Sequence, residues 1–212
     1  MGEGKSVLCV AGRHESEKII EKSRFITYSA HVESEEEARA FLAEIRSKHT
    51  MATHCCYAFI ADKLGNLQRF SDDGEPQGTA GVPILEVIKN KALYETAVAV
   101  VRYFGGIKLG AGGLVRAYSS CAAEHLAGAK ICSLEWCTEL YITVDYPFVD
   151  PLQNFLSFEK AVVLDQEYGG QVRVLVAVKA ADEPSFSARL TDRLQGKLRL
   201  ERGKEYYRAF EV

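Results

Sequence analysis

Runs of apolar residues predict short strands in the first part of the chain. Polar and apolar residues alternate over residues 23–32, which is typical of a half-buried strand. Residues 54–60, which read HCCYAFI, and residues 98–101, which read VAVV, are more uniformly apolar and predict buried strands. The turn sequence LGN at 64–66 predicts a hairpin with a short return strand. Residues 1–17 carry little pattern and indicate only a loose strand.

Helices with one apolar face are predicted between these strands. Ser34 is a good N-cap, three glutamates follow it in the first turn, and apolar residues recur at helical spacing up to Ile45. A second helix is expected to begin near Thr79, whose side chain could cap it. A third is expected from Leu114, with Gly128 as the residue that follows its last turn.

The last third of the chain has a cleaner pattern. After a short apolar run at 131–134, strands are predicted over residues 140–144, 161–168, 172–178 and 198–206. The two intervening helices open at Asp150-Pro151 and at Asp182-Glu183-Pro184. The resulting order is β-α-β-β-α-β, the ferredoxin-like arrangement. We therefore predict an α+β protein with two domains, residues 1–134 and residues 135–212.

Charge and composition limit the classes of function. The chain has 212 residues, is 47% hydrophobic and 26% charged, and has a formal net charge of -3, as in ordinary soluble globular proteins. Residues 1–134 carry 16 basic and 16 acidic side chains, and residues 135–212 carry 10 and 13. A strongly basic nucleic-acid binder is therefore excluded, and any positive patch must be local. No secretion signal or membrane-spanning run is visible, so we expect a cytoplasmic protein and no membrane partner.

The six cysteines indicate reduced thiols, because no C-x-x-C spacing occurs among them. Cys55 and Cys56 follow His54, but successive residues on a strand point to opposite faces, so His54 is poorly placed to activate Cys55. We interpret both as buried thiols. Cys121 and His125 lie on the apolar side of the third helix and are expected in the core.

The stretch from residue 97 to residue 118, AVAVVRYFGGIKLGAGGLVRAY, predicts a strand, a glycine loop and a helix. This order leaves backbone N–H groups at a helix N-terminus, where a phosphate or carboxylate is favoured. An arginine beside two aromatic residues suits a phosphate or a base, and Tyr103 could stack. An equally open interpretation is a turn whose glycines serve packing. The candidate phosphate-binding residues are Arg24, Arg102, Tyr103, Gly105, Gly106, Lys108, Gly110, Gly112, Gly113 and Arg116.

A second dense stretch, SDDGEPQGTAGVP at 71–83, holds three carboxylates within four residues. We favour a polar turn in which Asp side chains accept bonds from nearby backbone N–H groups. The alternative is a cation site or a general base. The residues of this second candidate surface are Ser71, Asp72, Asp73, Gly74, Glu75, Pro76, Gly78 and Thr79. We assign no catalytic residue, metal site or cofactor.

Three motifs together resemble the YigZ/Impact family: KSRFI from Lys22, FSDDGEPQGTAGVP from Phe70, and VVRYFGGIKLGAGGLVRAY from Val100. The resemblance covers nearly the whole chain. It implies an N-terminal Impact domain similar to the second domain of a small-subunit ribosomal protein. It also implies a ferredoxin-like C-terminal domain similar to one in elongation factor G, and a link to translation.

Three functions stay open at this point. We favour an accessory or regulatory protein that binds RNA or the ribosome through the locally basic glycine loop, with three or four phosphate contacts and a salt slope of roughly −2 to −4. The next is a module that binds a protein of the translation apparatus and no nucleic acid. The last is an enzyme that holds a phosphate or nucleotide on the glycine loop and uses Asp72, Asp73 or Glu75. No DNA sequence specificity is expected.

Overall fold

The computed structural model describes residues 6–211 and has two compact units, one mainly of residues 7–133 and one mainly of residues 134–210. Both contain helices and an antiparallel sheet, so the predicted α+β class is confirmed. Strand β7 (Ile131–Val144) is continuous where the sequence predicted two separate runs. Its middle residues include Glu135, Thr138 and Glu139, whose polar side chains interrupt the apolar pattern. No helix in the described part of the chain is long and apolar enough to span a bilayer.

The sheet of the first unit has antiparallel neighbours throughout, with β6 at its centre. In spatial order its strands are β2 (Arg13–Ile20), β3 (Ser23–His31), β6 (Thr96–Tyr103), β4 (His54–Ile60) and β5 (Gln68–Ser71). The strands predicted from the apolar runs are confirmed. The sequence pattern missed β2, which reads RHESEKII, because an edge strand can direct charged side chains to solvent. A further strand, β1 (Val7–Val10), pairs with β7.

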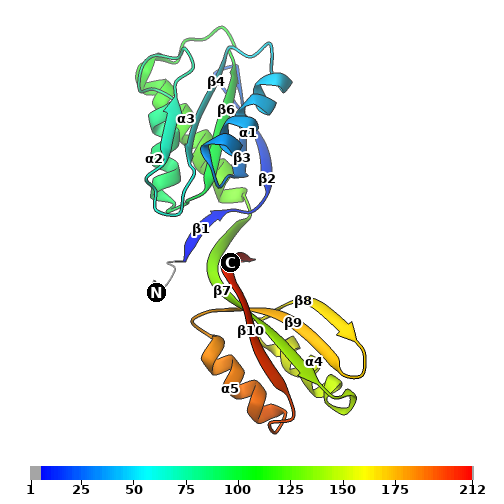
Figure 1. Ribbon diagram of the computed structural model, residues 1–212. Helices are drawn as coiled ribbons and strands as arrows, with labels where there is room; N and C mark the ends of the chain where they lie inside the picture. Colours follow the sequence, from blue (N-terminus) through cyan, green and yellow to red (C-terminus); the bar gives the residue numbers. More distant parts are fainter. Residues whose placement is uncertain (1–5, 212) are drawn as a thin grey trace. The chain divides into compact units, whose positions relative to one another are not determined.

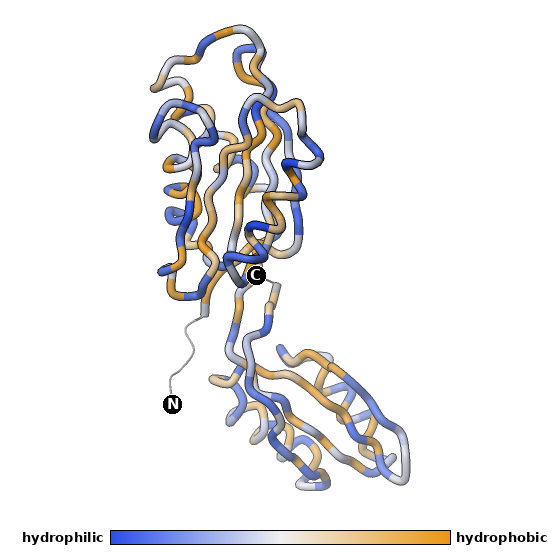
Figure 2. The backbone as a smooth tube through the Cα atoms, turned by 45° about the horizontal axis from the view of Figure 1, so that its top comes forward, coloured by the Kyte–Doolittle hydropathy of each residue, from blue (hydrophilic) through white to orange (hydrophobic). Residues whose placement is uncertain are grey.

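Helices cover both faces of this sheet (Figure 1). Helix α1 (Glu35–Lys48) packs on one face, and α2 (Gly81–Asn90) and α3 (Gly110–Gly128) pack on the other. Two apolar clusters result, which we call the α1-side core and the α2/α3-side core, and Figure 2 shows the hydrophobic positions along the strands between them. The α1-side core includes Ile26, Phe41, Ile45, Cys55 and Val101. The α2/α3-side core includes Phe25, Cys56, Ile84, Val100 and Tyr118.

The helix ends agree with the sequence pattern only in part. Ser34 caps α1 as predicted, since its side chain accepts a bond from the N–H of Glu37 at 3.1 Å. The prediction that Thr79 caps α2 is wrong, because its hydroxyl donates to the carbonyl oxygen of Pro76 at 2.6 Å. Helix α3 begins a turn before the predicted start, and Gly128 is its last residue instead of the residue beyond it.

The second unit follows the predicted β-α-β-β-α-β order, and its sheet has the spatial order β10-β7-β9-β8. Its remaining elements are η1 (Tyr146–Phe148), α4 (Val149–Phe158), β8 (Val162–Tyr168), β9 (Val172–Lys179), α5 (Glu183–Arg193) and β10 (Arg199–Glu211). Helix α4 begins before Asp150, so the prediction that Asp150 caps it is wrong; the preceding 3₁₀ turn already sets the helical direction. Apolar residues of α4 and α5 share one core with β7 and β9.

Candidate functional site

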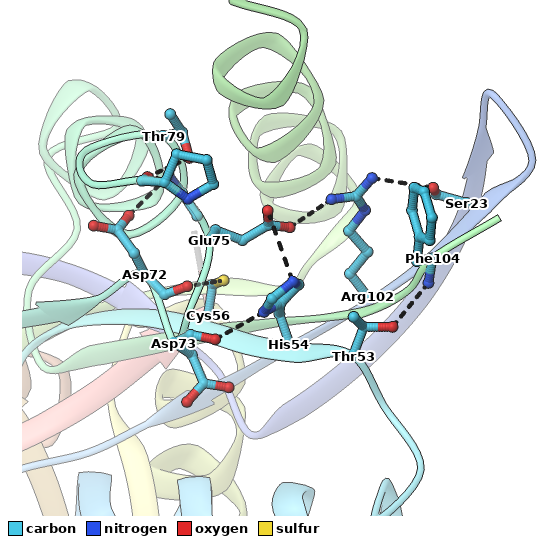
Figure 3. A network of polar contacts seen from close by, with 12 residues as sticks. Ser23, Thr53, His54, Cys56, Asp72, Asp73, Glu75, Thr79, Arg102 and Phe104 are labelled. Carbon is cyan, nitrogen blue, oxygen red and sulfur yellow. Dashed lines mark hydrogen bonds and ion pairs between the residues drawn. The ribbon is translucent and has the colours of Figure 1, made fainter. Parts of the chain in front are cut away.

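A buried ion pair joins the two dense motifs of the first unit (Figure 3). Arg102 lies near the end of the central strand β6 and is only 4% exposed. Its Nη1 donates to Oε1 of Glu75 at 2.6 Å, and its Nη2 donates to Oγ of Ser23 at 3.2 Å. The hydroxyl of Tyr118, on α3, donates to the same oxygen of Glu75 at 2.9 Å. One carboxylate therefore connects the acidic turn, the central strand and α3.

Aromatic rings enclose the guanidinium of this pair. Its carbon lies 5.4 Å from the ring centroid of Phe25 and 5.4 Å from that of Phe104. Such cation–π contacts strengthen as water is removed. Nη1 and Nη2 of Arg102 are both held by the protein, and Nε is buried. The structure thus places Arg102, which the sequence offered as a phosphate contact, inside the fold as a structural cation.

Asp72 lies before helix α2 in the sequence, and its side chain caps the N-terminus of that helix. Its Oδ1 accepts bonds from the N–H groups of Ala80 at 3.0 Å and Gly81 at 2.8 Å, and its Oδ2 accepts one from Gly78 at 2.8 Å. Burial alone would raise the pKa of Asp72, but the three N–H groups together outweigh it and hold the pKa below the ordinary value. This is the polar turn that the sequence favoured.

We expect Asp72→Ala to lower the free energy of unfolding at pH 7 by about 2 kcal/mol, because three backbone N–H groups at and just before the start of α2 lose their acceptor. A group whose pKa is depressed by folding stabilises the protein above its unfolded pKa, and this contribution disappears as pH falls through the folded pKa. The difference from wild type should therefore be constant from about pH 5 to 8 and narrow below about pH 4. Urea unfolding measures this difference, with Asp192→Ala, at an exposed position of α5, as the control. A difference in free energy of unfolding that does not change with pH would contradict the role of the ionised Asp72 carboxylate as the cap.

Asp73 has its own partners. Its Oδ1 accepts a bond from Arg46 at 3.1 Å, and its Oδ2 accepts one from the N–H of Cys55 at 2.7 Å. The three carboxylates of the acidic turn thus have different partners: Glu75 binds Arg102, Asp72 binds the start of α2, and Asp73 binds Arg46 and the N–H of Cys55. Over residues 6–211, the only cluster with metal-ligand geometry is His31, Glu33 and Glu95, which includes none of them. Nothing in this arrangement favours a cation shared by these carboxylates, which is one of the two forms of the enzyme hypothesis.

The glycine loop brings the chain close to β3 and then opens α3. A Cβ atom on Gly105 would lie 2.0 Å from the carbonyl oxygen of Lys22, so no other residue fits there unchanged. Gly106 and Gly110 have φ of 86° and 69°, which glycine adopts at little cost. Helix α3 then begins without a side-chain cap. Its first N–H groups, at Gly110, Gly112 and Gly113 among others, therefore lie at an uncapped helix N-terminus, where an anion is favoured.

Two cations border this helix end. Lys108 and Arg116 are exposed, and within residues 6–211 neither side chain makes a hydrogen bond or ion pair. With Leu109 and Gly113 they line a groove of about 660 Å³. Lys108 also lines a neighbouring pocket of about 240 Å³, together with Phe104, Glu75 and Arg102 among others. We call the first of these the α3 groove.

The structure separates Arg24 and Tyr103 from the α3 groove. These two residues are direct cross-strand partners, and the guanidinium of Arg24 lies 5.8 Å from the ring centroid of Tyr103. Arg24 also forms two bonds to Glu17, at 2.7 and 2.8 Å, and the hydroxyl of Tyr103 lies 2.8 Å from Nδ1 of His49. Tyr103 packs against the α1-side core, on the opposite face of the sheet. The predicted basic patch is therefore smaller than the sequence indicated.

The predictions for the thiols and for His125 are confirmed. Cys55 belongs to the α1-side core and Cys56 to the α2/α3-side core, and burial raises the pKa of both thiols. His125 is buried, with Nδ1 2.7 Å from Oγ of Ser16 and Nε2 2.9 Å from Oγ of Ser29. Burial lowers the pKa of His125 to about 4, so the ring is neutral near pH 7. Cys121 is also buried. None of these groups is placed as a nucleophile or base.

Several members of the network were not singled out in the sequence. Tyr118 and Phe25 look like ordinary apolar positions, and Ser23 like a strand end, until the fold brings them to Arg102. One signal was available. An arginine within an apolar run that predicts a buried strand must find an acidic partner, because an unpaired buried charge is too costly. That signal predicts an acidic partner for Arg102, and only the fold shows that the partner is Glu75.

Comparison with known proteins agrees with this two-unit description. The Impact N-terminal domain matches residues 21–126, and a domain of unknown function (DUF1949) matches residues 142–197. The IMPACT family member YvyE of Bacillus subtilis is 38% identical over 197 residues, which cover 93% of this chain and 90% of that protein. YigZ of Escherichia coli is 38% identical over 183 residues, covering 85% and 90%. A crystal structure of a hypothetical protein is 36% identical, with a TM-score of 0.61 over 94% of this chain and 97% of that one. The chain therefore belongs to the IMPACT family.

Proposed function

We propose that this protein is a translation-linked accessory factor that binds RNA, and that it contacts RNA phosphates in the α3 groove. The observation that supports this most directly is the pair of unpartnered cations, Lys108 and Arg116, beside the uncapped N-terminus of α3. The link to translation rests on the resemblance of the three motifs to the YigZ/Impact family. The β-α-β-β-α-β order of the second unit agrees with the ferredoxin-like arrangement that the same resemblance implies.

The chemistry of the groove suits a phosphate backbone more than a single charged side chain. Backbone N–H groups at a helix N-terminus are fixed donors in a positive field. Beside them, the flexible ammonium of Lys108 and the forked guanidinium of Arg116 supply further donors. No base-reading group is needed for such contacts. Among residues 6–211 only two unpaired cations border the groove, Glu21 also lines it, and the net charge of the chain is -3, so binding should be weak and sensitive to salt.

The buried network supports the groove from beneath without touching the ligand. Oγ of Ser23 accepts a bond from the N–H of Gly105 at 3.2 Å and another from Arg102. The same arginine is held by Glu75, which also binds Tyr118 of α3. The network therefore fixes where the glycine loop leaves β6 and where α3 begins. In this account Arg102 is a positioning residue, and Lys108 and Arg116 are the contacts.

We expect the protein to co-sediment with ribosomes at low salt and the double variant Lys108→Ala, Arg116→Ala to lose most of that binding. The control is Lys89→Ala, Lys91→Ala, which removes the same charge at the C-terminal end of α2, where Lys89 pairs with Glu86. Each sample is compared with and without nuclease. An equal loss of co-sedimentation in the two double variants would show that net charge, and not the α3 groove, determines the binding. Retention in the α3 groove variant would contradict the proposed site, and binding insensitive to salt and nuclease would favour a protein partner.

A further inference from the structure

Two buried thiols lie in contact at the two ends of the first unit. Cys9 is on β1, Cys132 is the second residue of β7, and their sulfur atoms are 3.0 Å apart. The two residues are separated by 123 positions in the sequence. We infer that Cys9 and Cys132 are a modification site, a dithiol that small two-electron oxidants convert into an intrachain disulfide that closes the first unit.

The strand pairing explains why these two side chains meet. β1 and β7 are neighbours in one sheet, and the N–H of Ala11 donates to the carbonyl oxygen of Lys130 at 2.8 Å just beyond them. Leu8 and Ile131 pack against the α2/α3-side core. Since successive residues of a strand alternate between faces, Cys9 and Cys132 share the opposite face. Neighbouring strands whose side chains share a face can bring two sulfur atoms within bonding reach, and those of Cys9 and Cys132 are 3.0 Å apart.

The other four thiols lack this arrangement. Cys55 and Cys56 are neighbours on one strand and point into different cores, and Cys121 and Cys137 lie on α3 and on the later part of β7. Over residues 6–211, Cys9 and Cys132 are the only two thiols within hydrogen-bonding distance of each other, whereas Cys56 and Cys137 contact oxygen atoms. Oxidation within the folded chain should therefore select one pair out of six cysteines.

Burial makes the reaction slow but does not prevent it. Cys9 is fully buried and Cys132 is 5% exposed. Burial, the bond to Cys132 and the charges of Glu95 and Glu33 all raise the pKa of Cys9, so little thiolate is present near neutral pH. Reaction therefore depends on transient opening and on a small oxidant, and it should proceed over minutes to hours.

Diamide, a small azo compound, is a suitable oxidant. The thiolate of one cysteine adds to an azo nitrogen, which gives a sulfenyl hydrazine. The second thiolate attacks that sulfur, the S–S bond forms, and the S–N bond breaks. Two electrons and two protons pass from the dithiol to the azo group, which leaves as a hydrazine. The product links Cys9 to Cys132 and encloses the chain between them.

The test is thiol counting and peptide mapping of the folded protein after diamide treatment. Free thiols are then blocked with N-ethylmaleimide in denaturant and counted by mass spectrometry. We expect wild type to lose two of its six free thiols, with one Cys9–Cys132 peptide two mass units below the dithiol form. Cys9→Ser and Cys132→Ser should each keep all five remaining thiols, and Cys121→Ser should still lose two.

The disulfide should also raise the midpoint of thermal unfolding by several degrees, reversibly with dithiothreitol, because it removes freedom from the unfolded chain. A disulfide between other cysteines, an intermolecular disulfide, or no loss of thiols under conditions that oxidise the urea-unfolded chain would each overturn the proposal. Mapping on wild type needs no substitution, so it decides the question even if a serine variant fails to fold.

Discussion

Replacing Glu75 with alanine is expected to lower the free energy of unfolding by about 3–5 kcal/mol, the cost of leaving one member of a buried ion pair without its partner. The side chains of Glu75 and Arg102 are only 4% and 5% exposed, so water cannot replace the missing carboxylate. The same substitution removes the acceptor of the Tyr118 hydroxyl. Urea unfolding followed by circular dichroism measures the effect.

A double-mutant cycle separates the pair from its surroundings. Removing both charges, with Glu75→Gln and Arg102→Met, should cost less than the sum of the two single changes and no more than the worse of them, because no unpaired charge stays buried. Asp165→Ala, at an exposed carboxylate of the second unit, is the control and should change stability by less than about 0.5 kcal/mol. A cost below about 1 kcal/mol for Glu75→Ala would contradict the central place of this pair.

Gly105→Ala is the second change with a large expected effect, a loss of at least about 3 kcal/mol, at the upper end of the cost of overpacking. The added Cβ would lie 2.0 Å from the carbonyl oxygen of Lys22 and 2.5 Å from the backbone N of Ser23. These are main-chain atoms, so β3 or the loop itself must move. The movement would also break the bond from the N–H of Gly105 to Oγ of Ser23.

Gly128→Ala is the matched control, since it is the same chemical change at the end of α3 with no atom within 4 Å of the new Cβ. It should be neutral or stabilise the protein by up to about 1 kcal/mol, as alanine favours the helical conformation. Thermal and urea unfolding of the two variants test the contrast. Similar stabilities for both would mean that the loop tolerates a shift, and that Gly105 has no special packing role.

Much of the architecture follows from local patterns. The apolar runs of β3, β4 and β6 and the Ser34 cap of α1 could be placed because each depends on residues close together in sequence. The β-α-β-β-α-β order of the second unit could be placed for the same reason. The strand β2 could not, because an edge position cancels the hydrophobic signal. Helix starts were displaced where the cap comes from a residue outside the helix, as Asp72 does for α2.

The sequence predicts which segments form the candidate site, but it does not predict what each side chain does there. The two motifs do meet, and the carboxylate that meets Arg102 belongs to Glu75, 27 positions away. Burial decides which cations can reach a ligand, and burial depends on long-range packing. Arg102 is therefore internal, while Lys108 and Arg116 are free. Alternation along the strand explains why Tyr103, one residue further, lies on the other face.

The most direct test of the account is the salt dependence of RNA affinity, measured by fluorescence anisotropy with a labelled single-stranded RNA. Each phosphate contact on a single strand contributes about 0.7 to the slope of log K against log salt concentration. We expect Lys108→Ala, Arg116→Ala to reduce the slope by about 1.4 relative to wild type, and Lys89→Ala, Lys91→Ala to leave it unchanged. Equal slopes for wild type and the α3 groove variant, or no binding by wild type at low salt, would contradict the proposal that this groove binds RNA.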